Sequence, residues 1–325
     1  MAGLSLRRTR QDGAIRELTR QVRPSVDQLI QPHFVVQNIS AREPVPGLNA
    51  VYRETPGSLL EQIEADLEQG VSKILLFGVP AEKSNTEFDH EFTAEQIAAV
   101  RQRFGKQIWI AADVCLCSST PHGHCGILNE SGDHVMNTAS VETLADAARL
   151  YASAGANCVA PSDMMDGRVA AIRQTLEQAG LDRTLIMSYS AKFHSSFYGP
   201  FRLAAESTPD KNIPLSDRGS YQVDPARPND ALLSALRDDR EGADILMVKP
   251  GLPYLDVLAE LSARIPKPWA VYQTSGESAA IELMARENLI RREAANLETW
   301  TAFVRAGASI IITYDARHAR TWLEK

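Results

Sequence analysis

The chain has 325 residues, 44% of them hydrophobic, and a formal net charge of −7 at pH 7. Its length suits one large α/β barrel or two medium domains, and its apolar content is enough for a large core. The negative charge argues against a nucleic-acid partner, and the sequence has no apolar run of about 18 residues that could span a membrane.

Basic residues are concentrated near the N-terminus, in the segment 6–23. Its arginines are interleaved with apolar residues, a pattern typical of a short amphipathic arm or a presequence. No continuous apolar stretch follows the first charges, so a secretory signal is not expected.

From this segment onward, short β-branched and apolar runs alternate with longer amphipathic stretches. The predicted strands are residues 33–36, 72–77, 107–114, 157–160, 184–188, 244–248, 269–273 and 309–313. The predicted helices are residues 59–69, 94–104, 141–154, 168–179, 229–241, 254–265, 279–287 and 294–306. Strict alternation predicts a closed parallel (β/α)₈ TIM barrel, and an open doubly wound sheet is the main alternative. No glycine-rich phosphate fingerprint favours the open sheet.

The segment 113–125 holds three cysteines and two histidines. Cys115, Cys117 and Cys125 can converge because a proline and a glycine between them allow the backbone to fold back. Three thiolates suit zinc best, and a site with three protein ligands keeps a position open for water or substrate. The cluster therefore predicts a catalytic zinc site.

Two alternatives to a catalytic zinc site stay open for this segment. A fourth ligand from His122 or His124 would close a structural zinc site, whereas buried thiols without a metal would be inert. The remaining cysteine, Cys158, lies in an apolar strand-like run and is predicted to be buried rather than disulfide-bonded. Unpaired cysteines are typical of a reducing cytoplasm, which is the expected location.

In such a barrel, the C-terminal ends of the strands form the mouth that carries the active site. Polar residues at or just after the predicted strands are Asp113, Ser162, Lys192, Lys249, Ser275 and Tyr314. Two lysines are therefore expected to point into one pocket.

The lysine pair predicts carbonyl chemistry. Burial of Lys249 at the end of an apolar strand should lower its pKa, and a second ammonium from Lys192 should lower that pKa further. A neutral amine can attack a ketone and form a Schiff base. The alternative is that each lysine forms only a salt bridge, with a carboxylate such as Asp113, Asp163 or Asp166.

Short motifs along the chain stand in the same order as in one enzyme family. They are Arg42-Glu-Pro, Leu76-Phe-Gly-Val-Pro, Asp113-Val-Cys-Leu-Cys, Ala160-Pro-Ser-Asp-Met-Met-Asp-Gly-Arg, Met187-Ser-Tyr-Ser-Ala-Lys, Met247-Val-Lys-Pro and Ser275-Gly-Glu. On these motifs, the chain resembles the zinc-dependent branch of the porphobilinogen synthases, also called 5-aminolevulinate dehydratases. The resemblance covers nearly the whole chain.

The resemblance implies a barrel domain at 29–325 and an N-terminal arm at 1–28 that wraps a neighbouring subunit in a homo-oligomer, typically an octamer. It implies a hydro-lyase that condenses two 5-aminolevulinate molecules to porphobilinogen with loss of two waters, in tetrapyrrole (heme) biosynthesis. In this family both lysines form Schiff bases, Lys249 with the first-bound substrate molecule and Lys192 with the second.

The resemblance also assigns binding roles. One catalytic zinc per subunit would be bound by Cys115, Cys117 and Cys125. The second substrate's carboxylate would be bound by lid residues Arg202, Arg218 and Gln222. The first substrate's carboxylate would be held by Ser275 and Tyr314. The pocket would also be lined by Asp113, Ser162 and Tyr198, with Asp113 a candidate for proton transfer; structural hydrogen bonds are the simpler role for Ser162 and Tyr198.

The sequence departs from the family pattern at several places. The lid segment 207–218 is longer and more polar than expected. Ser220 replaces a cysteine that binds an accessory zinc in some relatives, so a single zinc per subunit is predicted. Asp239 stands where many members have the glutamate of an allosteric magnesium site, and the shorter carboxylate leaves Mg²⁺ binding open.

Two other functions stay open. A class I Schiff-base aldolase on the same barrel needs one lysine and no zinc, so the second lysine and the cysteine cluster argue against it. A catalytically idle homologue kept for zinc binding or assembly would be expected to lose lysines or lid arginines, and none is missing.

Overall fold

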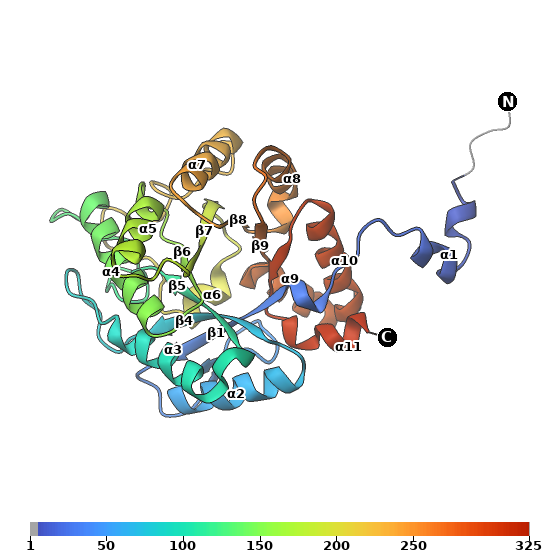
Figure 1. The fold of residues 1–325 in the computed structure, drawn as a ribbon, viewed down its shortest axis with the longest axis horizontal. Coiled ribbons are helices and arrows are strands. Elements are labelled where there is room, and N and C mark those ends of the chain that lie inside the picture. The colour runs from blue at the N-terminus through green and yellow to red at the C-terminus, as the bar shows by residue number, and fades with distance from the viewer. Residues whose placement is uncertain (1–5, 325) are drawn as a thin grey trace.

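The computed structural model describes residues 6–324. Parallel strands form a closed ring in which each pairs with the next and the last pairs with the first (Figure 1). In order around the ring they are β1 (Leu29–Val36), β4 (Lys73–Val79), β5 (Trp109–Val114), β6 (Cys158–Pro161), β7 (Leu185–Lys192), β8 (Ile245–Lys249), β9 (Trp269–Tyr272) and β10 (Ile310–Ile312). The predicted (β/α)₈ barrel is therefore confirmed, and the open sheet is excluded.

Helices cover the outside of the ring, as Figure 1 shows. The longer ones are α2 (Pro56–Glu68), α3 (Glu91–Phe104), α4 (Asn137–Ser153), α5 (Arg168–Gln178), α7 (Pro228–Arg240), α8 (Leu255–Arg264), α9 (Ser275–Arg286) and α10 (Arg292–Arg305). Several begin earlier than predicted. In α2 the reason is a capping box between Thr55 and Ser58 with Pro56 in the first turn, which starts the helix before its apolar stripe.

Short elements were not predicted. They are the helices α1 (Gly13–Leu18), α6 (Gly199–Ala204) and α11 (Ala319–Leu323), the small strands β2 (Glu43–Pro44) and β3 (Tyr52–Glu54), and the 3₁₀ turns η1 (Arg8–Arg10), η2 (Val26–Gln28), η3 (Gly105–Gln107), η4 (Leu252–Tyr254) and η5 (Ala316–His318). One or two turns carry too few residues to show a hydrophobic period. Along the described chain, no helix is long and apolar enough to cross a membrane.

Aromatic side chains fill the inside of the barrel. The ring of Phe77 lies 5.3 Å from that of Phe34 and 5.1 Å from that of Phe201, measured between centroids. Phe34 also stacks on Tyr314 near the end of the last strand. Because these rings fill the interior, polar chemistry is confined to the mouth above them.

Strand β7 is longer than predicted and irregular. Its pairing with β8 shifts between Ser188 and Ala191, which marks a β-bulge, and beyond the bulge Lys192 pairs with Lys249. A bulge re-aims the residues that follow it. The predicted strand ended at residue 188 because sequence pattern does not reveal such a shift.

The N-terminal segment leads away from the barrel (Figure 1). Neither η1 nor α1 contains a buried residue, and Leu18 keeps 77% of its surface exposed. In contrast, Val26 packs against the core. The part that stands clear of the barrel therefore ends before residue 26.

Candidate active site

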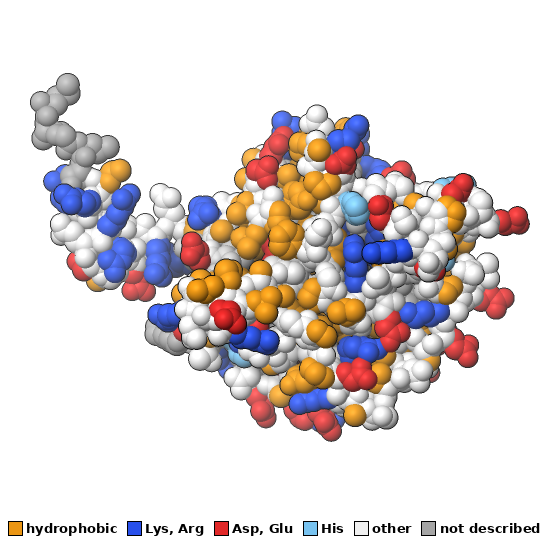
Figure 2. Space-filling model, turned by 180° about the vertical axis from the view of Figure 1, so that it is seen from behind, with side chains coloured by type: hydrophobic (Ala, Val, Ile, Leu, Met, Phe, Trp, Pro, Cys, Tyr) orange, Lys and Arg blue, Asp and Glu red, His pale blue; other side chains and the backbone are white. Residues whose placement is uncertain are grey.

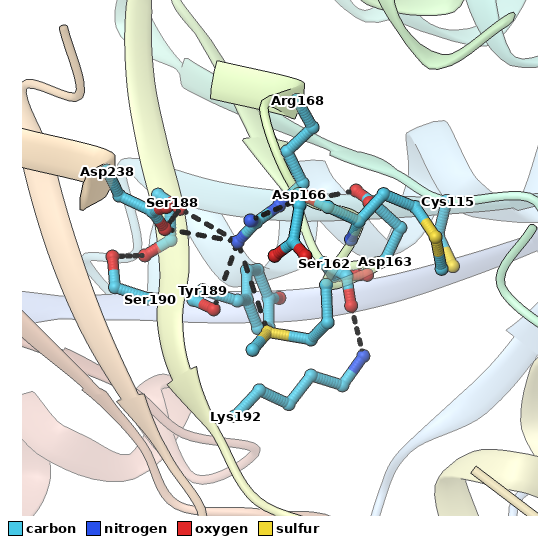
Figure 3. A network of polar contacts seen from close by, with 12 residues as sticks. Cys115, Ser162, Asp163, Asp166, Arg168, Ser188, Tyr189, Ser190, Lys192 and Asp238 are labelled. Carbon is cyan, nitrogen blue, oxygen red and sulfur yellow. Dashed lines mark hydrogen bonds and ion pairs between the residues drawn. The ribbon is translucent and has the colours of Figure 1, made fainter. Parts of the chain in front are cut away.

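Two lysine side chains lie side by side at the mouth of the barrel. Lys192 and Lys249 end adjacent strands at the same register, and they are only 5% and 3% exposed. The amine of Lys192 donates a hydrogen bond to the carbonyl of Ser162 (Figure 3). The Lys249 Nζ lies 4.0 Å from the ring centroid of Tyr272 and 4.8 Å from that of Phe201.

A purely structural salt bridge for each lysine does not fit the structure. Within residues 6–324, Asp163 pairs with Arg168 and Asp166 pairs with Arg237. The third carboxylate, Asp113, has one oxygen without any hydrogen-bond partner. Neither amine therefore forms a structural ion pair with Asp163 or Asp166.

The electrostatics of the pocket favour a neutral amine. Burial, together with the charge of Lys192, lowers the pKa of Lys249 to about 7. Burial also raises the pKa of Asp113 to about 6, although both lysines act to lower it. Near neutral pH, the pocket therefore offers an amine that is readily deprotonated and a carboxylate that can accept a proton.

The three cysteines of the β5–α4 loop converge. The sulfur atoms of Cys115, Cys117 and Cys125 all lie within 4.8 Å of one another. Three sulfur atoms this close together can reach a single metal ion. Hydrogen bonds from the other two thiols, with Arg218 nearby, lower the pKa of Cys125 well below its usual value. Soft, partly ionised donors fit zinc.

Neither histidine of the segment joins this group among the described residues. His124 uses both ring nitrogens elsewhere, since they lie 3.0 Å from the Tyr221 hydroxyl and 2.7 Å from the Leu215 carbonyl. The Nδ1 of His122 accepts a hydrogen bond from the backbone of His124. Among the described residues, the thiol group therefore offers three possible metal ligands and no histidine.

The lid segment 207–218 packs on the cysteine loop. Arg218 is 2% exposed and donates hydrogen bonds to the carbonyls of Gly123 and Ser207 at 2.8 and 2.6 Å. Gly123 has φ +70, and a Cβ added there would lie 2.8 Å from the carbonyl carbon of Thr208. Only glycine accommodates both the conformation and this close approach.

Three of the residues matched to carboxylate binding hold buried polar atoms without partners. Both side-chain polar atoms of Gln222 and the Nε atoms of Arg202 and Arg218 are buried and make no hydrogen bond. Gln222 also lines a cavity of about 820 Å³, whose lining includes Met164, Asp166 and Arg237 but neither lysine. Unpaired buried polar groups are costly, and a bound ligand would satisfy them.

The remaining predicted residues already make hydrogen bonds within the protein. The Ser275 hydroxyl accepts from the backbone N–H of Phe201 at 2.9 Å, and the hydroxyl of Tyr314 lies 3.1 Å from that of Tyr272. The Tyr198 hydroxyl donates to the carbonyl of Phe193 at 2.7 Å. Tyr198 thus has the structural hydrogen bond that was the simpler role for it.

Sequence reasoning missed a buried ion network around Arg168 (Figure 3). The guanidinium of Arg168 is 0% exposed and pairs with Asp163 at 3.6 Å and Asp238 at 3.2 Å. It also donates to the Ser188 hydroxyl and the Tyr189 carbonyl, within the bulge of β7 that precedes Lys192. Arg168 stood inside a recognised motif, but no local pattern reveals a partner 70 residues away.

The structure gives no support to magnesium binding at Asp239. The carboxylate of Asp239 lies 3.4 Å from the ammonium of Lys267. In the described part of the chain, no His, Cys, Asp or Glu group other than the three cysteines gathers closely enough to hold a metal. A magnesium ion at Asp239 therefore rests on the resemblance alone.

The chain matches a known protein family along nearly its whole length. The profile of the family "Delta-aminolevulinic acid dehydratase" matches residues 4–322. The chain belongs to this family. The predicted family is confirmed, and with it a hydro-lyase rather than an aldolase.

Relatives in this dehydratase family match along nearly their whole length. The Helicobacter pylori delta-aminolevulinic acid dehydratase is 40% identical, with 98% of each chain covered. The Bos taurus protein is 43% identical over 93% of this chain and 92% of the relative. The solved dehydratase (porphobilinogen synthase) of Toxoplasma gondii, in complex with the product porphobilinogen, has a TM-score of 0.94 at 36% identity and covers 98% of this chain and 91% of that one.

Proposed function

We propose that the protein condenses two molecules of 5-aminolevulinate to porphobilinogen with loss of two waters, using Lys249 and Lys192 as Schiff-base nucleophiles. The observation that carries the proposal is the pair of buried amines at equal register on β8 and β7. Burial of two amines close together favours the neutral form, which a nucleophilic amine needs.

Each lysine would bind one substrate molecule through its ketone. The neutral amine of Lys249 attacks the ketone carbon of the first molecule, a carbon–nitrogen double bond forms, and water leaves. Lys192 does the same with the second molecule. Its amine donates to the Ser162 carbonyl, and Asp113, whose pKa both lysines lower, is the candidate to accept the proton that must leave.

The carboxylates of the two substrate molecules need separate partners. Ser275 and Tyr314 would bind the carboxylate of the molecule on Lys249. On the other side, Arg202, Arg218 and Gln222 would bind the carboxylate of the second molecule, because a guanidinium matches a carboxylate with two parallel hydrogen bonds. Support comes from the unpaired buried polar atoms of Arg202 and Gln222.

Cys115, Cys117 and Cys125 would hold one zinc ion per subunit. When bound, zinc would act as a Lewis acid toward the second substrate's carbonyl or hold a hydroxide. Arg218 lies close to these thiolates, which raise its pKa although its burial opposes this. Arg218 would therefore stay charged and link the metal loop to the lid.

The proposal includes assembly through the N-terminal arm, residues 1–28, in a homo-oligomer such as an octamer. It is supported by the described part of the arm, which buries none of its own residues and exposes Leu6 and Leu18. Hydrophobic side chains also gather on one face of the barrel (Figure 2). The reducing cytoplasm is the proposed location because all four cysteines are free.

The test is porphobilinogen formation from 5-aminolevulinate by the purified protein. Samples are compared before zinc chelation, after it, and after zinc is returned. We expect product to vanish and return in the wild type, and a Cys125→Ala variant to stay inactive with zinc present. Cys158→Ala serves as the control because this buried cysteine lies outside the thiol group.

Each part of the proposal can fail separately. Product that survives complete zinc removal would overturn the metal role and leave the condensation standing. If zinc-loaded protein formed no product, the idle homologue would become the better interpretation.

A further inference from the structure

Glu277 is a buried carboxylate with no cation partner in the described structure. It is 2% exposed and lies in the first turn of α9, two residues after Ser275. Its Oε2 accepts hydrogen bonds from the backbone N–H of Thr274 at 2.6 Å and from the Thr274 hydroxyl at 2.7 Å. The bond from the Thr274 N–H belongs to the capping box of α9, a local role that glutamine performs as well.

The same carboxylate also reaches a different loop. Its Oε1 accepts from the N–H of Leu252 at 2.5 Å, and its Oε2 accepts from the N–H of Gly251 at 3.3 Å. Both donors follow Lys249 by two or three residues and lie 25 and 26 residues from Glu277 along the chain. Helix capping does not require them, so Glu277 joins the loop after β8 to the loop after β9.

Both joined loops are tightly held on their other sides. A Cβ added to Gly251 would lie 2.5 Å from the ring of Phe303, and the N–H of Gly276 donates to the carbonyl of Phe197 at 2.9 Å. The Ser275 hydroxyl is fixed by the N–H of Phe201. With little room for either loop to shift, the Glu277 bonds determine how the two loops sit relative to each other.

We propose that Glu277 is a positioning residue that fixes the separation between the Lys249 amine and the Ser275 hydroxyl, and so selects oxo acids by chain length. The inference rests on the proposed function, in which these two groups hold the ketone and the carboxylate of one substrate molecule. A fixed separation fits a 4-oxo acid and places the ketone of a 5-oxo acid one methylene away from the amine.

A charged carboxylate suits this position better than an amide. All four groups that face Glu277 are donors, and both of its oxygens accept. In a Glu277→Gln variant, the amide nitrogen would face N–H or O–H donors wherever it was placed. The variant should keep part of the helix cap but loosen the contact between the loops.

The experiment traps the lysine adduct with two probe acids, 4-oxopentanoate and 5-oxohexanoate. The Lys249 amine attacks the ketone, water leaves, and borohydride reduces the carbon–nitrogen double bond to a stable secondary amine. Peptide mass spectrometry then measures the adduct at Lys249. The readout is the ratio of the two adducts, which a general loss of stability would not change.

We expect the wild type to favour 4-oxopentanoate and the Glu277→Gln variant to lose about tenfold of that preference, since small misplacements of reacting groups have effects of this order. Glu282→Gln is the matched control, because Glu282 lies on the same helix and pairs with Arg286 and Arg292 instead of a mouth loop. Should Glu277→Gln fail to fold, the ratio is read on Glu277→Asp, whose shorter side chain cannot span both loops.

The outcomes separate this inference from the proposed function. Adducts at Lys249 in the wild type, with an unchanged ratio in both Glu277 variants, would overturn the positioning role alone. No adduct at Lys249 in the wild type would overturn the Schiff-base role of that lysine, and the inference with it.

Discussion

At the scale of single residues, the mouth of the barrel holds buried ionisable groups that interact with one another. Lys249 has aromatic rings around its amine, Asp113 has an unpaired oxygen, and Arg168 has two carboxylates and no exposed surface. Each charge depends on its neighbours, because a buried group has little bulk water to compensate a missing partner. Single substitutions should therefore change the properties of residues that stay in place.

The first prediction concerns the pH dependence of Lys249. An ammonium has no lone pair, so adduct formation at this lysine should rise as pH increases through about 7, where its amine loses its proton. Lys192→Met removes a positive charge that favours the neutral form, so the pKa of Lys249 should rise and the midpoint should move to higher pH. Borohydride trapping across pH measures the midpoint. The exposed Lys106→Met is the control, and a midpoint that stays in place or falls in Lys192→Met would contradict the prediction.

The second prediction concerns the ion network. Arg168→Met would leave the buried Asp163 without a guanidinium partner, and Asp238 would lose one of its two arginine partners. The free energy of unfolding should therefore fall by roughly 3–5 kcal/mol. Urea unfolding measures the loss. Arg149→Met, on the exposed side of α4, should change little. Equal stability of the two variants would show that the network contributes little.

Sequence reasoning worked unevenly at this scale. The lysines and cysteines were found because strand ends and close spacing are visible in the sequence, and the structure places them in one region. Arg168 and Asp238 were missed because their pairing depends on how α5 and α7 pack against β7. The same holds for Glu277, whose motif was recognised but whose contacts with the β8 loop need the fold.

At the scale of elements, the lid and the cysteine loop form one unit. His124 contacts the Leu215 carbonyl of the lid segment, Arg218 at the end of that segment donates to the Gly123 carbonyl, and a Cβ on Gly123 would meet Thr208. A change in the loop should therefore alter lid closure without touching the lid itself.

Gly123→Ala tests this connection. Its Cβ would press on the Thr208 carbonyl and its backbone would be held at positive φ, which together cost about 1–2 kcal/mol. KM for 5-aminolevulinate should rise about tenfold or more as the closed lid is destabilised. Gly180→Ala is the control, with φ +71 and nothing within 4 Å of the added atom. Similar KM values for both variants would mean that backbone strain, and not contact with the lid, is the cause.

The positions of helices and strands were predictable where a hydrophobic period runs over many residues. Prediction failed where contacts between distant segments determine the local structure. The predicted strands all correspond to barrel strands, whereas α6 and the bulge of β7 were missed. Arg168 donates to the Tyr189 carbonyl within the bulge, a contact between distant residues that the local hydrophobic pattern does not reveal.

At the scale of the whole molecule, the barrel is complete without its N-terminal segment. Its first strand begins at Leu29, and the described residues before Val26 pack against no core. Folding of the barrel and assembly of subunits are therefore expected to be separable.

Deletion of residues 1–23 should leave the barrel folded and reduce the molecular mass in solution. The shortened protein retains Ser25, which caps the η2 turn, and Val26, which packs on the core. Light scattering measures the mass and circular dichroism measures the fold. A Leu252→Ser variant, changed on the barrel surface, is the control for loss of an exposed apolar side chain. An unchanged mass after deletion would contradict the proposed role of the arm.

Closure of the ring has a consequence for how the protein is made. Leu29 pairs with Ile311, so the first barrel strand to be synthesised cannot complete its pairing until almost the whole chain has been made. Until then the growing chain has open sheet edges, at its newest strand and along the part of β1 that β3 does not pair, and such edges are prone to pair with other chains. The thiols are synthesised long before Ser275 and Tyr314, so the metal loop exists before the pocket that it serves. A chain released before β10 is an open sheet, and a message cut short at that point would yield no barrel.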